Sequence, residues 1–115
     1  MHELSITQSI VESVAEKVGD RQVTCVRLEI GKLSGVVVES IRFCFDLVAD
    51  GTPLRGARLE ITEPSGRARC RSCGHGFDTD DPVVLCPSCG DADVEVSAGR
   101  DVRILSVQVR SPAVR

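Results

Sequence analysis

Apolar residues recur at helical spacing in two segments of the chain. One apolar stripe, in residues 4–18, consists of Leu4, Ile10, Val11, Val14, Ala15 and Val18. The other, in residues 37–48, consists of Val37, Val38, Ile41, Cys44, Phe45 and Val48. Ser5 and Gln8 are spaced as a capping box, and Gly19 suits a C-terminal cap. The pattern predicts two amphipathic helices, of which the first begins almost at residue 1 and the second ends at Asp50-Gly51.

Three other segments alternate between apolar and polar residues, as half-buried strands do. These segments are residues 22–30, 57–62 and 102–109. Residues 65–97 stand between the last two strands and are bounded by turn-forming residues. We therefore predict an α+β fold in which two helices cover one face of a three-stranded antiparallel sheet. The expected domains are residues 1–64 with 98–115, and an inserted lobe of residues 65–97.

Two features of the sequence bear on where the chain works. No apolar stretch approaches the roughly 20 residues that a membrane span requires, so no membrane partner is expected. The first residues lack the basic and apolar regions of a secretory signal, which favours the reducing cytoplasm. Cysteines in that compartment are expected to bind metal or to take part in chemistry.

Four of the six cysteines form two matching pairs inside the lobe. Cys70 with Cys73, and Cys86 with Cys89, are each followed by glycine, and twelve residues separate the pairs. Four thiolates complete the tetrahedral shell of Zn²⁺ and leave no position for water, so we predict one structural zinc ion per chain in a zinc-ribbon lobe. A redox dithiol pair is the alternative.

The two remaining cysteines, Cys25 and Cys44, lie far from these pairs in the sequence. They fall inside a predicted strand and a predicted helix, where cysteine serves as a small buried hydrophobic residue. His75 follows Cys73 by two residues. Because four cysteines already complete a zinc shell, we expect His75 at the surface or hydrogen-bonded around that shell.

The charges and the histidine count disfavour two classes of function. Residues 65–98 carry three arginines against six acidic residues, and the charges of the rest of the chain balance, so no basic stripe is available for nucleic acid. An enzyme would need an open metal position, or a nucleophile with a base. Two histidines and a saturated zinc supply neither, so the chain is not expected to be an enzyme.

A second group of potential metal ligands stands at the start of the chain. His2 places an imidazole within a few bonds of the α-amino group and the first backbone amides. These nitrogens form a square-planar set that suits Ni²⁺ or Cu²⁺. The first amides of a helix have no intrahelical acceptor, so their loss to a metal costs the helix no hydrogen bond. On this chemistry alone, a solvated His2 with no ligand remains the alternative.

Residues along the whole chain resemble the HypA/HybF family. The resemblance rests on Met1-His2-Glu3-Leu4-Ser5, Ile30-Gly31-Lys32-Leu33-Ser34, Gly56-Ala57-Arg58-Leu59 and the two cysteine pairs. Proteins of this family are nickel metallochaperones for the maturation of nickel-iron hydrogenase. The resemblance implies that Met1, His2 and Glu3 hold Ni²⁺ as transferable cargo. The implied donors are the terminal amine, the His2 imidazole and the amides of His2 and Glu3.

The resemblance also implies the partners of this carrier. They are a HypB-type GTPase and the hydrogenase large subunit, and the carrier itself is expected to be a monomer or a weak homodimer. Some relatives have a histidine after each cysteine pair; here only His75 matches, because Gly90-Asp91 follows the second pair. The competing hypothesis is a zinc-ribbon adaptor that binds protein or nucleic acid and carries no nickel.

Overall fold

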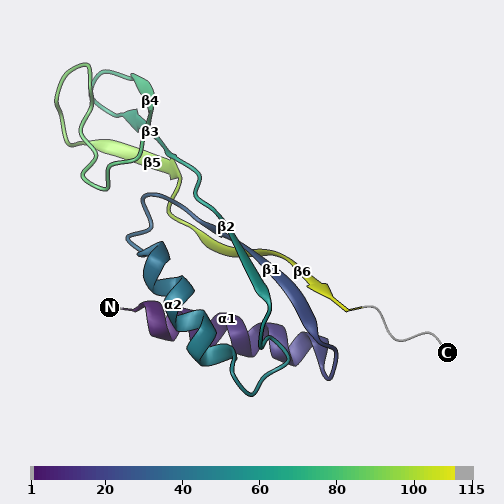
Figure 1. The fold of residues 1–115 in the computed structure, drawn as a ribbon. Coiled ribbons are helices and arrows are strands. Elements are labelled where there is room, and N and C mark those ends of the chain that lie inside the picture. Colours follow the sequence, from purple (N-terminus) through teal and green to yellow (C-terminus); the bar gives the residue numbers. More distant parts are fainter. Residues whose placement is uncertain (1, 111–115) are drawn as a thin grey trace. The chain divides into compact units, whose positions relative to one another are not determined.

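A computed structural model describes residues 2–110 of the chain (Figure 1). These residues divide into two compact units, of which the first contains residues 2–28, Val36–Ile61 and 104–110, and the second contains Glu29–Gly35 and Thr62–Arg103. The elements in chain order are α1 (Glu3–Val18), β1 (Val23–Ile30), α2 (Val38–Ala49), β2 (Arg58–Thr62), β3 (Gly66–Cys70), β4 (Gly76–Thr79), β5 (Val94–Ala98) and β6 (Val102–Val109).

In the first unit, α1 and α2 pack against each other on one face of a sheet with the strand order β2–β1–β6 (Figure 1). Apolar side chains of both helices and of β1 meet in the core between these layers. The buried apolar residues of this unit are Ile10, Val11, Val14, Val18, Val23, Cys25, Val26, Leu28, Ile41, Phe45, Ala49 and Leu54. The predicted α+β class, with two helices and a cysteine-bearing lobe, is confirmed. Within residues 2–110, neither helix has the length and apolarity that crossing a bilayer requires.

The ends of α1 differ in how well the sequence predicts them. Gly19 is the C-terminal cap as expected, with φ of 62° and its N–H donating to Ala15 O over 3.1 Å. The predicted capping box of Ser5 and Gln8 is wrong, because the helix begins at Glu3. The N-cap is His2, whose side chain makes no capping hydrogen bond. The apolar stripe also begins later than expected, since Leu4 is 49% exposed.

The edge strand β6 runs antiparallel to β1, as predicted. Thr24 Oγ1, near the start of β1, donates to Gln108 O near the end of β6 over 3.2 Å. At the other ends of the two strands, Arg103 pairs with Glu29 over 2.9 Å. Contacts that advance along one strand and retreat along the other define antiparallel pairing.

The direction of β2 departs from the expectation. Gln22 Nε2, just before β1, donates to Arg55 O, just before β2, over 3.0 Å. Lys32 N, just after β1, donates to Pro64 O, just after β2, over 3.0 Å. The two strands therefore run in the same direction and the sheet is mixed. The reason is that α2 is a crossover connection, which returns the chain to the end of the sheet where β1 began.

The second unit is built on an antiparallel sheet with the order β4–β3–β5. Ala68, in the central strand, lies opposite Phe77 of β4 and Val96 of β5. The apolar core is small and consists of Ile30, Leu33, Ala68, Cys70 and Cys86. The hydrophobic effect alone supplies little stability to a unit of this size.

Three glycines bring separate segments of the second unit into backbone contact. A Cβ added to Gly31 would overlap the carbonyl group of Gly99. A Cβ added to Gly99, whose φ is 100°, would meet the backbone of Gly66. Leu33 N also donates to Gly99 O over 2.8 Å. This close approach explains why Glu29–Gly35 is grouped with Thr62–Arg103 in the second unit.

We predict that Gly31→Ala destabilises the second unit, because the neighbour of the new methyl group is backbone and cannot move aside cheaply. The free energy of unfolding should fall by about 1–3 kcal/mol, as for overpacked cores. Urea unfolding followed by circular dichroism measures the change. Gly76→Ala is the matched control, because the nearest neighbour of its new Cβ would be the flexible end of the Arg67 side chain, at 3.2 Å, and the backbone lies at an ordinary contact distance. Equal stability of the two variants would contradict the close approach.

Candidate metal centre

The four cysteines of the two pairs come together in the second unit. Their sulfur atoms all lie within 4.8 Å of one another. Cys70 Sγ is 3.6 Å from Cys89 Sγ, and Cys73 Sγ is 3.6 Å from Cys86 Sγ. A tetrahedral ion with metal–sulfur bonds of about 2.3 Å separates its sulfurs by about 3.8 Å. The tetrad therefore has the dimensions of a four-sulfur metal site, and its sulfurs are too far apart for disulfides.

The two cysteine pairs have the same backbone structure, which we call the first and second knuckle (residues 70–75 and 86–91). In the first knuckle, Gly74 N donates to Cys70 O over 2.9 Å and Cys70 N donates to His75 O over 2.9 Å. The second repeats both bonds between the corresponding residues, at 2.8 and 2.9 Å. Gly74 and Gly90 have φ of 80° and 77°, a conformation that favours glycine. The glycine after each pair is therefore required by the turn that aims both sulfurs inward.

Polar contacts join the first knuckle to the second knuckle and to the residues just after it. Ser72 Oγ donates to Asp91 Oδ2 over 2.5 Å, and this bond lowers the pKa of Asp91. Arg71 N donates to Asp93 O over 2.9 Å, while its guanidinium group lies 3.1 Å from the Asp93 carboxylate. Sequence patterns did not reveal these contacts, because serine and aspartate in turns have many other uses. They hold the two pairs at the separation that one ion requires.

The thiols of the tetrad have divergent pKa values in the absence of a cation. Burial of Cys86 disfavours its thiolate, but the amides of Cys89 and Ser88 and the Cys73 thiol outweigh burial and lower its pKa to about 7. The amide of Asp91 lowers the pKa of Cys89, but the neighbouring thiols and burial prevail and raise it to about 12. Four adjacent thiolates would repel one another. The thiols therefore give up their protons when a dication binds and neutralises the thiolates.

His75 does not belong to the sulfur tetrad. Within residues 2–110, the only group spaced to hold a metal consists of the four cysteines. The His75 ring is instead stacked on Phe77, with centroids 5.9 Å apart and planes 13° from parallel. The backbone of His75 supports the site through the hydrogen bond that its carbonyl group accepts from Cys70.

The candidate nickel residues lie at the start of α1. Met1 falls outside the described residues. His2 is exposed, and its carbonyl group accepts the first helical hydrogen bond, from Ile6 N, over 2.9 Å. Glu3 is buried, with 8% of its surface exposed, and its Oε2 accepts a hydrogen bond from Val37 N over 2.9 Å. This bond lowers the pKa of Glu3, and it commits the carboxylate to the start of α2.

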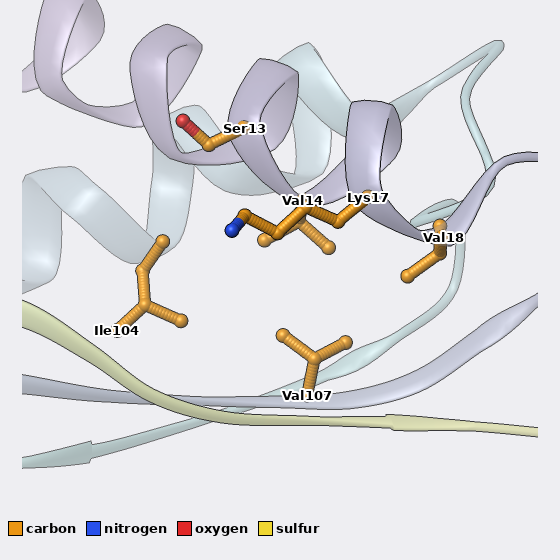
Figure 2. A pocket seen from close by; sticks show the side chains of 6 residues that line it. All are labelled: Ser13, Val14, Lys17, Val18, Ile104 and Val107. Carbon is orange, nitrogen blue, oxygen red and sulfur yellow. The ribbon is translucent and has the colours of Figure 1, made fainter.

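The two remaining cysteines and a pocket lined by α1 and β6 lie in the first unit. Cys25 is buried, as predicted, whereas Cys44 is half-buried. A pocket of about 430 Å³ lies between α1 and β6 of the first unit (Figure 2). Its lining consists of Ser13, Val14, Lys17, Val18, Ile104 and Val107. No thiol, imidazole or carboxylate occurs among these lining residues, so this pocket is not a candidate metal site.

Comparison with known proteins bears on the identity of the chain. Residues 1–109 match the family model described as "Hydrogenase/urease nickel incorporation, metallochaperone, hypA". The chain belongs to the HypA family. Similar relatives include the hydrogenase maturation factor HypA of Rippkaea orientalis, which is 43% identical over 99% of this chain and 100% of its own length. The HypA of Geobacter metallireducens is 45% identical over 95% of this chain and 99% of its own length.

Solved structures of HypA proteins share the fold. The solution structure of the Ni metallochaperone HypA from Helicobacter pylori matches with a TM-score of 0.64 and 23% identity, and it covers 97% of this chain and 100% of the other. A second solution structure of a HypA protein matches with a TM-score of 0.57 and 21% identity, over 93% of this chain and 92% of the other. At these identities the similarity shows a common fold.

We predict that Glu3→Ala exposes the Val37 amide to solvent exchange, because the variant removes its hydrogen-bond acceptor. Amide hydrogen exchange of Val37 should be at least tenfold faster than in the wild type. Glu3→Gln is the matched control, since its side-chain oxygen still accepts this bond and should retain most of the protection. Equal exchange in all three proteins would show that the Glu3 carboxylate does not cap α2 in solution.

Proposed function

We propose that this chain is a nickel carrier for the maturation of nickel-iron hydrogenase. Ni²⁺ binds at the N-terminus through the amine of Met1, the imidazole of His2 and the amides of His2 and Glu3. Zn²⁺ binds to the four cysteines and stabilises the lobe. The first domain, residues 1–64 with 98–115, has the nickel function, and the second, residues 65–97, has the zinc function. The proposal rests most directly on the exposed His2 at the start of α1, in a chain of the HypA family.

The chemistry of the tetrad supports zinc as the resident ion. Thiolate ligands in a tetrahedral arrangement favour Zn²⁺ over hard cations and over square-planar Ni²⁺. All four positions are filled by sulfur, so the ion has no open site for a substrate. Its role is therefore structural, and the protein acts as a carrier and not as an enzyme. Cysteines that form no disulfides suit the reducing cytoplasm.

The position of Glu3 supports main-chain nitrogen as the nickel donor. Its Oε2 already accepts the Val37 amide, which favours the Glu3 amide over the carboxylate as the group that meets the metal. Amines, amidates and imidazole around one ion give the square-planar field that Ni²⁺ accepts and Zn²⁺ does not favour. The exposure of His2 leaves the ion accessible to an acceptor. The proposed acceptors are a HypB-type GTPase and the hydrogenase large subunit.

We predict that the wild type binds one zinc ion per chain and that Cys70→Ala lowers the zinc affinity at least a hundredfold. Removing one thiolate opens the shell and leaves three ligands, and structural zinc contributes about 10–16 kcal/mol in small peptides. Metal analysis after dialysis against a chelator measures retention. Cys44→Ala is the matched control and should retain zinc, because this half-buried cysteine lies outside the tetrad. Zinc retention by Cys70→Ala would overturn the zinc assignment.

We predict that His2→Ala, or a tag that extends the N-terminus, abolishes stoichiometric Ni²⁺ binding while zinc remains bound. Titration of the untagged protein, read by the absorption of planar nickel, measures the affinity. Glu3→Gln is the control and should bind Ni²⁺ within about threefold of the wild type, because the donor is its backbone amide. If His2→Ala keeps the wild-type nickel affinity, the carrier hypothesis fails and the adaptor hypothesis is favoured.

A further inference from the structure

The sulfur tetrad contains two close contacts between sulfur atoms, and each contact joins one knuckle to the other. Cys70 Sγ lies opposite Cys89 Sγ, and Cys73 Sγ lies opposite Cys86 Sγ, both at 3.6 Å. A disulfide bond is about 2.05 Å long, so the two sulfurs of either contact need to approach by only about 1.5 Å to form one. A shift of this size is within the reach of side-chain rotation, provided that no ion holds the sulfurs apart.

Each of these contacts pairs an exposed cysteine with a buried one. Cys73 and Cys89 are exposed, whereas Cys70 and Cys86 are 1% and 2% exposed. A thiolate that reacts with a small oxidant must be accessible, and a second thiolate beside it then completes a disulfide. Each contact therefore combines a sulfur that an oxidant can reach with a shielded sulfur that can resolve the oxidised product.

The contacts around the tetrad favour disulfides between the knuckles over disulfides within them. Ser72 donates to Asp91 of the second knuckle, and Arg71 binds Asp93 just after it. None of these bonds involves a sulfur atom, so they hold the knuckles together whether or not an ion is bound.

The spacing of the cysteines in the chain favours the same pairing. The cysteines that meet across the knuckles are 13 and 19 positions apart, whereas those of one pair are three positions apart. A disulfide that closes a longer loop removes more entropy from the unfolded chain and so stabilises the folded chain more.

We propose that the sulfur tetrad is also a site of reversible oxidation by hydrogen peroxide, which forms the disulfides Cys73–Cys86 and Cys70–Cys89 and releases the zinc ion. This inference rests on the zinc assignment of the proposed function and adds a reaction of the same site. Disulfide sulfur carries no negative charge, so the ion loses its ligands. The two disulfides then join the knuckles in place of the ion, and the lobe stays closed.

Each disulfide consumes one molecule of peroxide. The exposed thiolate attacks one peroxide oxygen, the O–O bond breaks, and a sulfenic acid and a hydroxide ion form. The buried thiolate then attacks the sulfenic sulfur, so that the S–S bond forms, the S–O bond breaks and a second hydroxide leaves. Two protons from the solvent convert both hydroxides into water. Two thiolates thus lose two electrons, and one peroxide is reduced to two water molecules.

The test treats the full chain, loaded with zinc, with hydrogen peroxide and follows zinc release with a chromophoric chelator. Remaining thiols are alkylated after denaturation. Digestion with trypsin and with a protease that cleaves before aspartate isolates Cys70 in residues 70–71, Cys73 in residues 72–77, and Cys86 with Cys89 in residues 81–90. Mass spectrometry without reduction then identifies the peptides that are linked.

We expect the release of one zinc ion for every two peroxide molecules consumed. The product should contain three peptides, with residues 81–90 linked to both of the others. Fragmentation between Cys86 and Cys89 should place residues 72–77 on Cys86 and residues 70–71 on Cys89. Reduction with dithiothreitol should restore the binding of one zinc ion.

The matched control is Cys44→Ala, which removes a half-buried thiol outside the tetrad. This variant should release zinc within twofold of the wild-type rate and should give the same linked peptides. Slower release would assign the reaction with peroxide to Cys44 and overturn the proposal.

The pairing of the cysteines is the decisive result. Residues 70–71 linked only to residues 72–77 would show disulfides within the knuckles and overturn the proposal. Zinc retained after the peroxide is consumed, sulfinic acids without disulfides, or no zinc binding after reduction would also overturn it. Failure of the zinc assignment is distinguishable, because in that case the wild type holds no stoichiometric zinc before peroxide is added, and this inference fails with it.

Discussion

Four sulfur atoms within 4.8 Å of one another are the constraint on which the second unit depends. As thiolates they repel, and as thiols they offer only weak hydrogen bonds, so their proximity is stable when a tetrahedral dication lies among them. The surrounding unit has few buried apolar side chains with which to offset that repulsion. The two knuckles reduce the cost by fixing each pair of sulfurs through local backbone hydrogen bonds. Only the separation between the knuckles is then left to longer-range contacts such as Ser72 with Asp91.

The two candidate metal sites differ in burial and in ligand type, as the proposed roles of a structural ion and a transferable ion require. The sulfur tetrad includes two buried cysteines, Cys70 and Cys86, and it fills a complete shell, which favours retention. The nickel site that we propose at the N-terminus would use the exposed His2 and main-chain nitrogen, a set that favours exchange with a partner. Retention and exchange are opposite demands on one ion, so a carrier that also needs a structural metal benefits from two chemically distinct sites. Differences in ligand softness and geometry would direct the two proposed ions to different sites.

The sequence predicts the local features of this molecule better than the features that depend on distant contacts. The sulfur site could be predicted, because two residues between cysteines and a following glycine fix the turn whatever surrounds it. The direction of β2 could not, since alternation looks the same in parallel and antiparallel strands. The approach of Gly31 to Gly99 joins residues far apart in the chain and leaves no periodic signal. The role of Glu3 was missed for the same reason: its partner Val37 is 34 residues away.

The bond between Glu3 and Val37 has an electrostatic consequence, because it holds the first turns of α1 and α2 next to each other. Each helix carries about half a positive charge at this end, so two such ends converge where the chain starts. The Glu3 carboxylate, whose pKa is lowered by this bond, contributes a negative charge at the same place. Its charge offsets the two converging helix dipoles and allows the two helix starts to lie side by side.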